Sequence, residues 1–184
     1  MLRMKALTVF AAAAVLADIA HAQGYFEFGR IPGITAEPTV QIDLSSAMLA
    51  FVNSAARATD PASADAMAGI QGVRVYVYET IEDSQAVLDF IDDTSGALEG
   101  DGWERTVFVQ EAESKVRIYV KLDEAQITGL TVMVFDASGE AVFINVAGQI
   151  NPAQLGQLMN TVGMDGVLKN LSGTDTGASN LPPP

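Results

Sequence analysis

Cysteine is absent from the 184-residue sequence, and the single histidine, His21, lies close to the N-terminus. Without cysteine the chain cannot form a disulfide framework, a thiolate nucleophile, a zinc–thiolate site or a lipid-modified cysteine. If the N-terminal residues are removed, as the pattern described below predicts, the remaining chain also has no imidazole. A Ser-His-Asp triad and a histidine-ligated metal are then excluded.

Recognisable catalytic motifs are lacking as well. The sequence contains no G-x-S-x-G, no S-x-x-K, no Walker loop and no glycine-rich dinucleotide fingerprint. We therefore expect a protein that is not an enzyme and that uses no cofactor. A carboxylate pair of the glycosidase type stays open as the alternative, because the chain has 23 Asp and Glu and such pairing is spatial.

Positive charge is scarce. Ten Lys and Arg stand against 23 Asp and Glu, which gives a formal net charge of −13 at pH 7. A chain this acidic repels phosphate backbones, so nucleic acid is not an expected partner. The simplest consequence of the excess acid is solubility.

The N-terminus has the pattern of an export signal. Arg3 and Lys5 form a basic region, residues 6–17 are apolar but shorter than the about 20 residues that span a bilayer, and residues 20–22 (AHA) give a small-x-small cleavage site. We expect residues 1–22 to be a signal peptide and the product to be periplasmic or secreted. An uncleaved membrane anchor is the alternative. No later stretch is apolar enough to span a membrane.

Composition divides the rest of the chain into three parts. Residues 23–38 contain three Gly and two Pro and predict an irregular lead-in. Residues 172–184 are dominated by Gly, Ser, Thr and Pro, which predicts a disordered tail. Residues 39–171 are expected to form a single domain.

Apolar residues at three- and four-residue spacing predict four helices. The apolar positions of the first, which Asp43 or a following serine caps, are Leu44, Ala47, Met48, Phe51, Val52 and Ala55. Asp60-Pro61 opens a short second helix. Residues 80–83 resemble a capping box that starts a third, which buries Val87, Leu88 and Ile91 and ends at the glycines of residues 96–102.

The fourth predicted helix begins at Asn151. Residues 151–154 (NPAQ) form a capping box with Pro at the first helical position, and Ile150 and Leu155 are spaced as its hydrophobic staple. The helix presents Leu155, Leu158, Met159 and Val162, and Gly163 ends it.

Alternating apolar residues predict five strands, over residues 70–79, 103–110, 115–122, 127–136 and 140–148. The last four are joined by connections of a few residues, which permit only antiparallel neighbours. The expected fold is therefore α+β, with an antiparallel sheet of about five strands (a four-stranded meander plus one strand) and helices packed on it.

The last two predicted strands are apolar on both faces. Leu130, Val132 and Val134 alternate with Met133 and Phe135, and the strand over residues 140–148 has the same character. Such strands are central ones covered on both sides, or covered by a partner. Asn145, within this apolar context, is expected to be a satisfied core amide or an edge residue.

One group of polar and aromatic side chains is the best candidate for a binding site. Rigid rings and guanidinium groups that share one face of a sheet are typical of binding surfaces. The candidates are Arg74, Tyr76, Tyr78, Trp103, Arg105, Arg117, Tyr119 and Lys121. They would bind an acidic or carbohydrate-like partner; alternatively, they are cross-strand pairs on a solvated face, balanced by Glu79, Glu104 and Glu111.

A second, weaker candidate is acidic. Asp89, Asp92 and Asp93 share a helix face at i, i+3 and i+4, and oxygen ligands suit calcium. The spacing does not match the D-x-[DN]-x-[DN]-G loop, so a solvated acidic face is the simpler interpretation and no metal site is expected.

The strand and cap sequences resemble a known family. Residues 69–79 (GIQGVRVYVYE) and 142–155 (VFINVAGQINPAQL) are similar to the bacterial exported family called domain of unknown function 4252. The resemblance covers about residues 40–170. It implies an exported protein but brings no activity, cofactor or catalytic residue, and relatives that look like lipoproteins differ from this cysteine-free chain.

Three functions remain open from the sequence. The leading hypothesis is a non-catalytic binding or accessory protein of the bacterial cell envelope, whose partner is another envelope protein. The alternatives are a carboxylate-dependent envelope hydrolase and a structural module that associates with itself.

Overall fold

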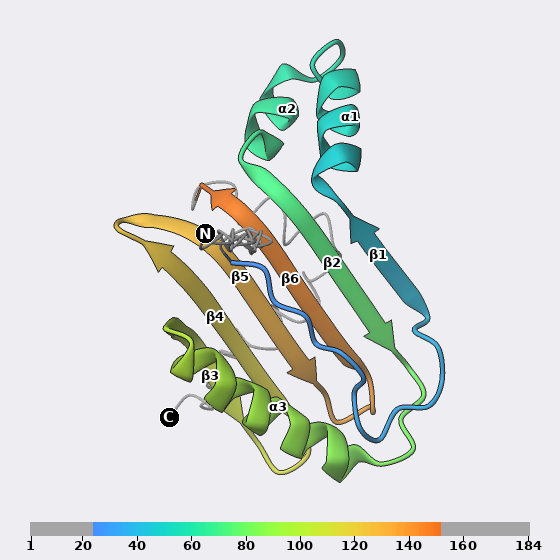
Figure 1. Ribbon diagram of the computed structural model, residues 1–184. Coiled ribbons are helices and arrows are strands. Elements are labelled where there is room, and N and C mark those ends of the chain that lie inside the picture. The colour runs from blue at the N-terminus through green and yellow to red at the C-terminus, as the bar shows by residue number, and fades with distance from the viewer. Residues whose placement is uncertain (1–23, 152–184) are drawn as a thin grey trace, which may run out of the picture.

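A computed structural model describes residues 24–151, which form six strands and three helices around one antiparallel sheet (Figure 1). The strands are β1 (Val40–Leu44), β2 (Ile70–Tyr78), β3 (Trp103–Gln110), β4 (Lys115–Asp123), β5 (Gln126–Phe135) and β6 (Ala141–Ile150). The helices are α1 (Ser46–Ala56), α2 (Pro61–Met67) and α3 (Ser84–Gly100). The strand order is β1-β2-β6-β5-β4-β3, so the α+β class and the β3–β6 meander are confirmed.

The sheet has one strand more than expected. β1 pairs antiparallel with β2, from Val40 opposite Val77 to Leu44 opposite Val73. The sequence-based interpretation placed Leu44 in the first helix, because its spacing from Ala47 and Met48 is also helical. The helix in fact begins after Ser45, whose side chain accepts a hydrogen bond from the Met48 amide.

The third helix begins later than the capping-box pattern indicated. Asp83, not Thr80, is its N-cap, and the Asp83 carboxylate accepts from the Ala86 amide. Glu82 instead accepts hydrogen bonds from the hydroxyl (2.5 Å) and amide (3.0 Å) of Thr35 in the lead-in, and these bonds lower the pKa of Glu82. A long-range partner therefore overrode the local capping signal.

The lead-in, residues 24–38, has no regular structure but is packed onto the sheet. It lies on the same face as α3 (Figure 1), where Phe28, Ile31 and Ile34 are buried. At its start the backbone of Gly24 has φ +87° and lies so close to Thr128 and Gly129 that a Cβ there would overlap them. Only glycine suits both this conformation and this contact.

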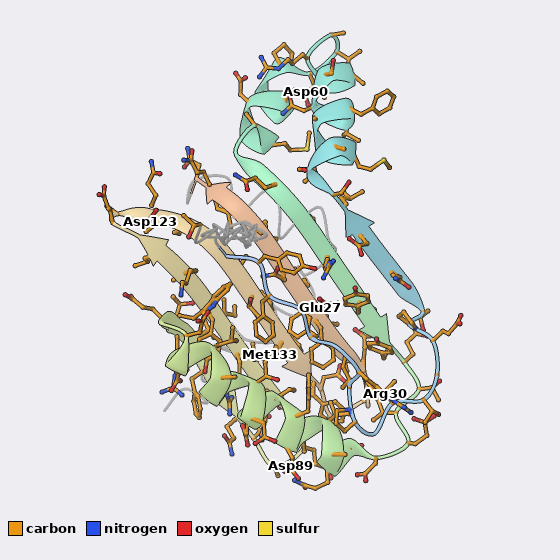
Figure 2. All side chains as sticks on the ribbon, viewed as in Figure 1. Glu27, Arg30, Asp60, Asp89, Asp123 and Met133 are labelled. Carbon is orange, nitrogen blue, oxygen red and sulfur yellow. The ribbon has the colours of Figure 1, made fainter. Side chains whose placement is uncertain are left out.

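Two hydrophobic clusters lie on opposite faces of the sheet. The first contains Val132, Ile144 and their neighbours on β2, β4, β5 and β6. The second joins Met133 and Phe143 to the lead-in and to Val87, Leu88, Ile91 and Leu98 of α3. Met133 lies on the face of the sheet that α3 covers (Figure 2). The expectation that the central strands are buried on both faces is thus confirmed, as are the predicted buried positions of α3.

Three predicted segments lie outside the described residues. They are the signal peptide (residues 1–22), the fourth helix after Asn151, and the tail (residues 172–184). Within residues 24–151, no helix has the length and apolar character needed to cross a membrane.

Candidate functional site

The eight side chains of the predicted binding face do share one face of the sheet. Trp103 lies opposite Lys121 and Arg105 opposite Tyr119 in the β3–β4 register. Arg74, Tyr76 and Tyr78 alternate along β2 on the same face. That face is the one covered by α3 and the lead-in. Trp103, Arg117 and Tyr119 are consequently buried and do not form an open surface.

Acidic residues of α3 and of its C-cap, Asp101, meet the basic residues of β3 and β4. Arg105 pairs with Glu99 (3.4 Å between Nη1 and Oε1) and Lys121 with Asp101 (3.6 Å between Nζ and Oδ2). The partners are not the sheet carboxylates Glu79, Glu104 and Glu111 that the sequence suggested. The reason is that α3 packs across β3 and β4 and brings its own carboxylates to the cations.

The most buried of these contacts centres on Asp92. Its Oδ2 accepts from Lys115 Nζ, and its Oδ1 lies 3.3 Å from Arg117 Nη2. The side chains of Lys115 and Arg117 are only 7% and 2% exposed, whereas Asp92 is 50% exposed. The positive charges of two buried side chains are therefore compensated by one carboxylate that is itself half exposed.

Arg117 is further held by the β3 edge. Its Nη1 donates to the Val109 carbonyl (2.6 Å) and its Nη2 to Gln110 Oε1 (2.7 Å). The guanidinium carbon lies 3.8 Å from the ring centroid of Phe108, which also lies 4.8 Å from the Arg105 guanidinium carbon. A fully partnered guanidinium of this kind is a structural group.

Arg74, at the other end of the face, is also engaged. Its side chain contacts Asp43 of β1 (3.4 Å), Glu27 of the lead-in (3.9 Å) and the ring of Tyr25 (4.4 Å to the centroid). Tyr76 and Tyr78 are partly buried against the second cluster. A binding role for the five residues of the face that are not buried stays a prediction.

The acidic helix face does not assemble a cation site among residues 24–151. Asp89 accepts from Gln85 (2.8 Å), and Asp92 is occupied by Lys115 and Arg117. Within these residues no three acidic side chains gather closely enough to ligate a metal ion. The calcium interpretation thus has no geometric support here.

Two carboxylates in the β5–β6 turn have divergent pKa values. Burial tends to raise the pKa of Asp136, but hydrogen bonds from Ser138, Gly139 and Glu140 outweigh it and lower the pKa. Burial raises the pKa of Glu140, and the charges of Asp136 and Glu79 add to this. The hydrogen bonds of Asp136 close its own turn, so they are explained by local structure rather than by acid–base catalysis.

Tyr119 provides a test of how this interface responds to pH. Its hydroxyl donates to Glu99 (3.0 Å). Burial raises the pKa of the phenol, and the Glu99 contact adds to this rise, while a hydrogen bond with Ser95 opposes it. A raised folded-state pKa stabilises the fold fully below the unfolded value of about 10, and this stabilisation is lost as pH rises through the folded value. Burial also raises the pKa of Tyr78, so we expect the 295 nm titration to show two phenols that ionise late.

One of the two late phenols should be missing in Tyr119→Phe, which should also lose less stability than the wild type between pH 10 and pH 11. Tyr76→Phe is the control, because its removal should leave both late phenols in place. A Tyr119→Phe titration with both late phenols still present would contradict the assignment.

An apolar surface that the sequence pattern does not reveal lies on α1. The α1–α2 hairpin extends beyond the ends of β1 and β2 (Figure 1), with Asp60 between its two helices (Figure 2). Met48, Phe51 and Val52 are exposed, Phe51 by 73%, and they lie on one side of α1 by helical spacing. These three residues are called the α1 stripe below. Their periodicity predicted a helix but not which side of it is covered; the buried residue of α1 is Leu49.

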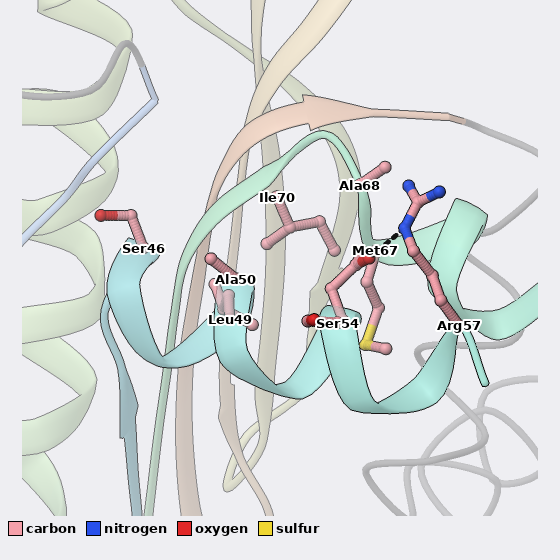
Figure 3. Close-up of a pocket in the computed structure, with 9 residues that line it drawn as sticks. Ser46, Leu49, Ala50, Ser54, Arg57, Met67, Ala68 and Ile70 are labelled. Atoms are coloured by element: carbon pink, nitrogen blue, oxygen red, sulfur yellow. Dashed lines mark hydrogen bonds between the residues drawn. The ribbon is translucent and has the colours of Figure 1, made fainter. Parts of the chain in front are cut away.

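The opposite side of α1 lines a cavity of about 410 Å³ (Figure 3). Leu49, Ala50 and Asn53 form its α1 wall, and the α2–β2 junction at Met67, Ala68 and Ile70 forms the other. Arg57 Nε donates to Asn53 Oδ1 (3.1 Å) at this cavity. Because α1 meets the molecule through this side, the α1 stripe faces outward. The absence of any charged residue in α1 was the sequence signal for it.

The fold and its surfaces define a small α+β domain built on one antiparallel sheet. The family model described as Domain of unknown function (DUF4252) matches residues 35–158, and the chain belongs to that family. No curated protein and no solved structure matches the chain.

Proposed function

We propose that this protein is a non-catalytic binding protein, exported to the bacterial cell envelope, that contacts a partner protein through the α1 stripe. The observation that carries the proposal is the exposure of Met48, Phe51 and Val52 on a hairpin that extends beyond the sheet. Large apolar side chains grouped in this way on a protein surface are typical of interaction sites. The export pattern of residues 1–22 supports the location.

The chemistry of α1 favours a protein groove over a lipid surface. Helices that lie in membrane interfaces carry Lys and Arg on their polar face, whereas α1 carries no charge and the whole chain has a net charge of −13. Met48, Phe51 and Val52 follow the i, i+3, i+4 pattern by which a helix occupies an apolar groove. The partner we infer is therefore an envelope protein that presents such a groove.

Replacing Phe51 tests this function. A photo-cross-linking amino acid at position 51 should join the protein to one partner in periplasmic extract, and the partner is then purified. Because an aromatic anchor at the centre of an interface contributes about 2 kcal/mol or more, Phe51→Ser should weaken binding about thirtyfold or more. Leu122→Ser removes an exposed apolar side chain from β4, away from α1. It is therefore the matched control, and this variant should bind the partner normally.

Two outcomes would overturn the proposed partner. Cross-links only between copies of this chain, with a concentration-dependent sedimentation coefficient that Phe51→Ser abolishes, would instead show self-association. Equal loss of binding in Phe51→Ser and Leu122→Ser would show that α1 is not the contact surface.

A further inference from the structure

One face of the sheet is buried although the described helices do not cover it. Val132 is 0% exposed and Ile144 3%, and both belong to the first cluster. The lead-in and α3 pack on the opposite face, against Met133 and Phe143. Within residues 24–151, the only helical residue of the first cluster is Leu49 of α1, near the end of β2. A valine at the centre of a sheet becomes inaccessible to solvent only when another layer lies over it.

We propose that this layer is the segment of residues 152–163 of the same chain, packed as an amphipathic helix across β6, β5 and β4. The chain leaves the sheet at Ile150, at the end of a central strand, and Ile150 itself lies in the first cluster. Ile150 occupies the position before the cap residue Asn151. In a hydrophobic staple this position contacts the fourth helical residue, which is Leu155.

The contact between Ile150 and Leu155 therefore determines on which face of the sheet the helix lies. Because the Ile150 side chain is on the Val132–Ile144 face, its contact with Leu155 starts the helix on that face. Leu158, Met159 and Val162 then follow at helical spacing on the same side of the segment. The Val132–Ile144 face of β4, β5 and β6 has no covering layer among the described helices, and the apolar face of the segment needs a partner. The segment follows β6 directly in the chain.

The length and the charge of residues 152–163 suit a helix that covers the Val132–Ile144 face. A twelve-residue helix is about 18 Å long, and neighbouring strands are about 4.8 Å apart, so the segment can cross the apolar centre of the sheet. Residues 152–163 contain no Asp, Glu, Lys or Arg. A second copy of the chain would bring another net charge of −13 toward this face, whereas the tethered segment brings none and has a high effective concentration.

Because the chain has no cysteine, single introduced thiols report on each face separately. In the full chain, Val132→Cys places a thiol under the proposed cover, and Met133→Cys places one on the face covered by α3. Leu158→Asp with Met159→Asp should expel the segment and raise the labelling rate of the thiol at position 132 by about tenfold or more, leaving that at position 133 unchanged. Gln157→Asp with Asn160→Asp adds the same charge to the opposite side of the helix and should change neither rate.

The second measurement identifies the occupant. A photo-cross-linker at position 158 should react within the same chain, with residues of β4, β5 or β6. Cross-links between isotopically distinct copies, or the absence of cross-links to these strands, would overturn the proposal. So would an unchanged labelling rate at position 132 in the Leu158→Asp, Met159→Asp variant. If the double variant raises the labelling rate at both positions, Leu158→Ala is tested in its place. The proposal is also overturned if Leu158→Ala does not raise the labelling rate at position 132 more than the rate at position 133.

Discussion

Replacing Asp92 with alanine is expected to lower the free energy of unfolding by about 2–3 kcal/mol. The change leaves the buried ammonium of Lys115 and the buried guanidinium of Arg117 without their shared carboxylate. Breaking a fully buried pair costs about 3–5 kcal/mol, and we expect less here because Asp92 is half exposed and solvent screens it. Urea unfolding followed by circular dichroism measures the difference.

Asp89→Ala is the matched control for this prediction. Asp89 lies on the same helix and has the same charge, but its carboxylate accepts only an exposed hydrogen bond from Gln85. We expect a change of less than about 0.5 kcal/mol. For a protein with a net charge of −13, loss of one negative charge in general relieves repulsion, so a large destabilisation specific to Asp92 reports the local contact. Equal effects of the two substitutions would contradict this account.

Replacing Asn145 with alanine is expected to destabilise the protein by about 2–4 kcal/mol. Asn145 is buried, and its amide oxygen accepts from the Phe26 amide (3.0 Å) while its nitrogen contacts the Gly24 carbonyl (3.1 Å) and Thr131 Oγ1 (3.1 Å). Removal leaves these buried groups without a partner. Two of them belong to the lead-in, so the loss should be greatest there.

Hydrogen exchange distinguishes this local effect from a general one. In Asn145→Ala, amides of residues 24–38 should exchange faster by a larger factor than those of β5, because the side chain joins the lead-in to the sheet. Asn53→Ala is the control: its side chain also donates to a backbone carbonyl, that of Ala64, but within the α1–α2 hairpin. A uniform increase in exchange across the sheet would refute the role of Asn145 in holding the lead-in.

Asn145 also shows what a sequence can predict about a polar residue in a strand. Its apolar neighbours identified it as a core amide or an edge residue, and the structure confirms the first of these. The sequence could not name its partners, because Gly24 and Phe26 are about 120 residues away and belong to a segment with no regular pattern. The network depends on where the lead-in crosses the sheet.

The predicted binding face shows a second limit of what the sequence can predict. Alternation correctly placed eight basic and aromatic side chains on one face, because side-chain direction in a strand has a period of two. Alternation carries no information on what lies above that face. The acidic side of α3 covers β3 and β4, so Arg117 and Tyr119 became interior residues. Asp92 is the partner of Arg117, and Glu99 is the partner of Tyr119.

By itself, the sequence determined the β3–β6 meander, the α+β class, the two apolar faces of the central strands and the buried positions of α3. These follow from periodicity and from short connections, which are local properties of the chain. Only the tertiary structure decided that β1 adds to the edge of β2, that Glu82 binds Thr35 and that the apolar residues of α1 face outward. Each of these depends on which distant segment packs against the residue, and no local pattern encodes that choice.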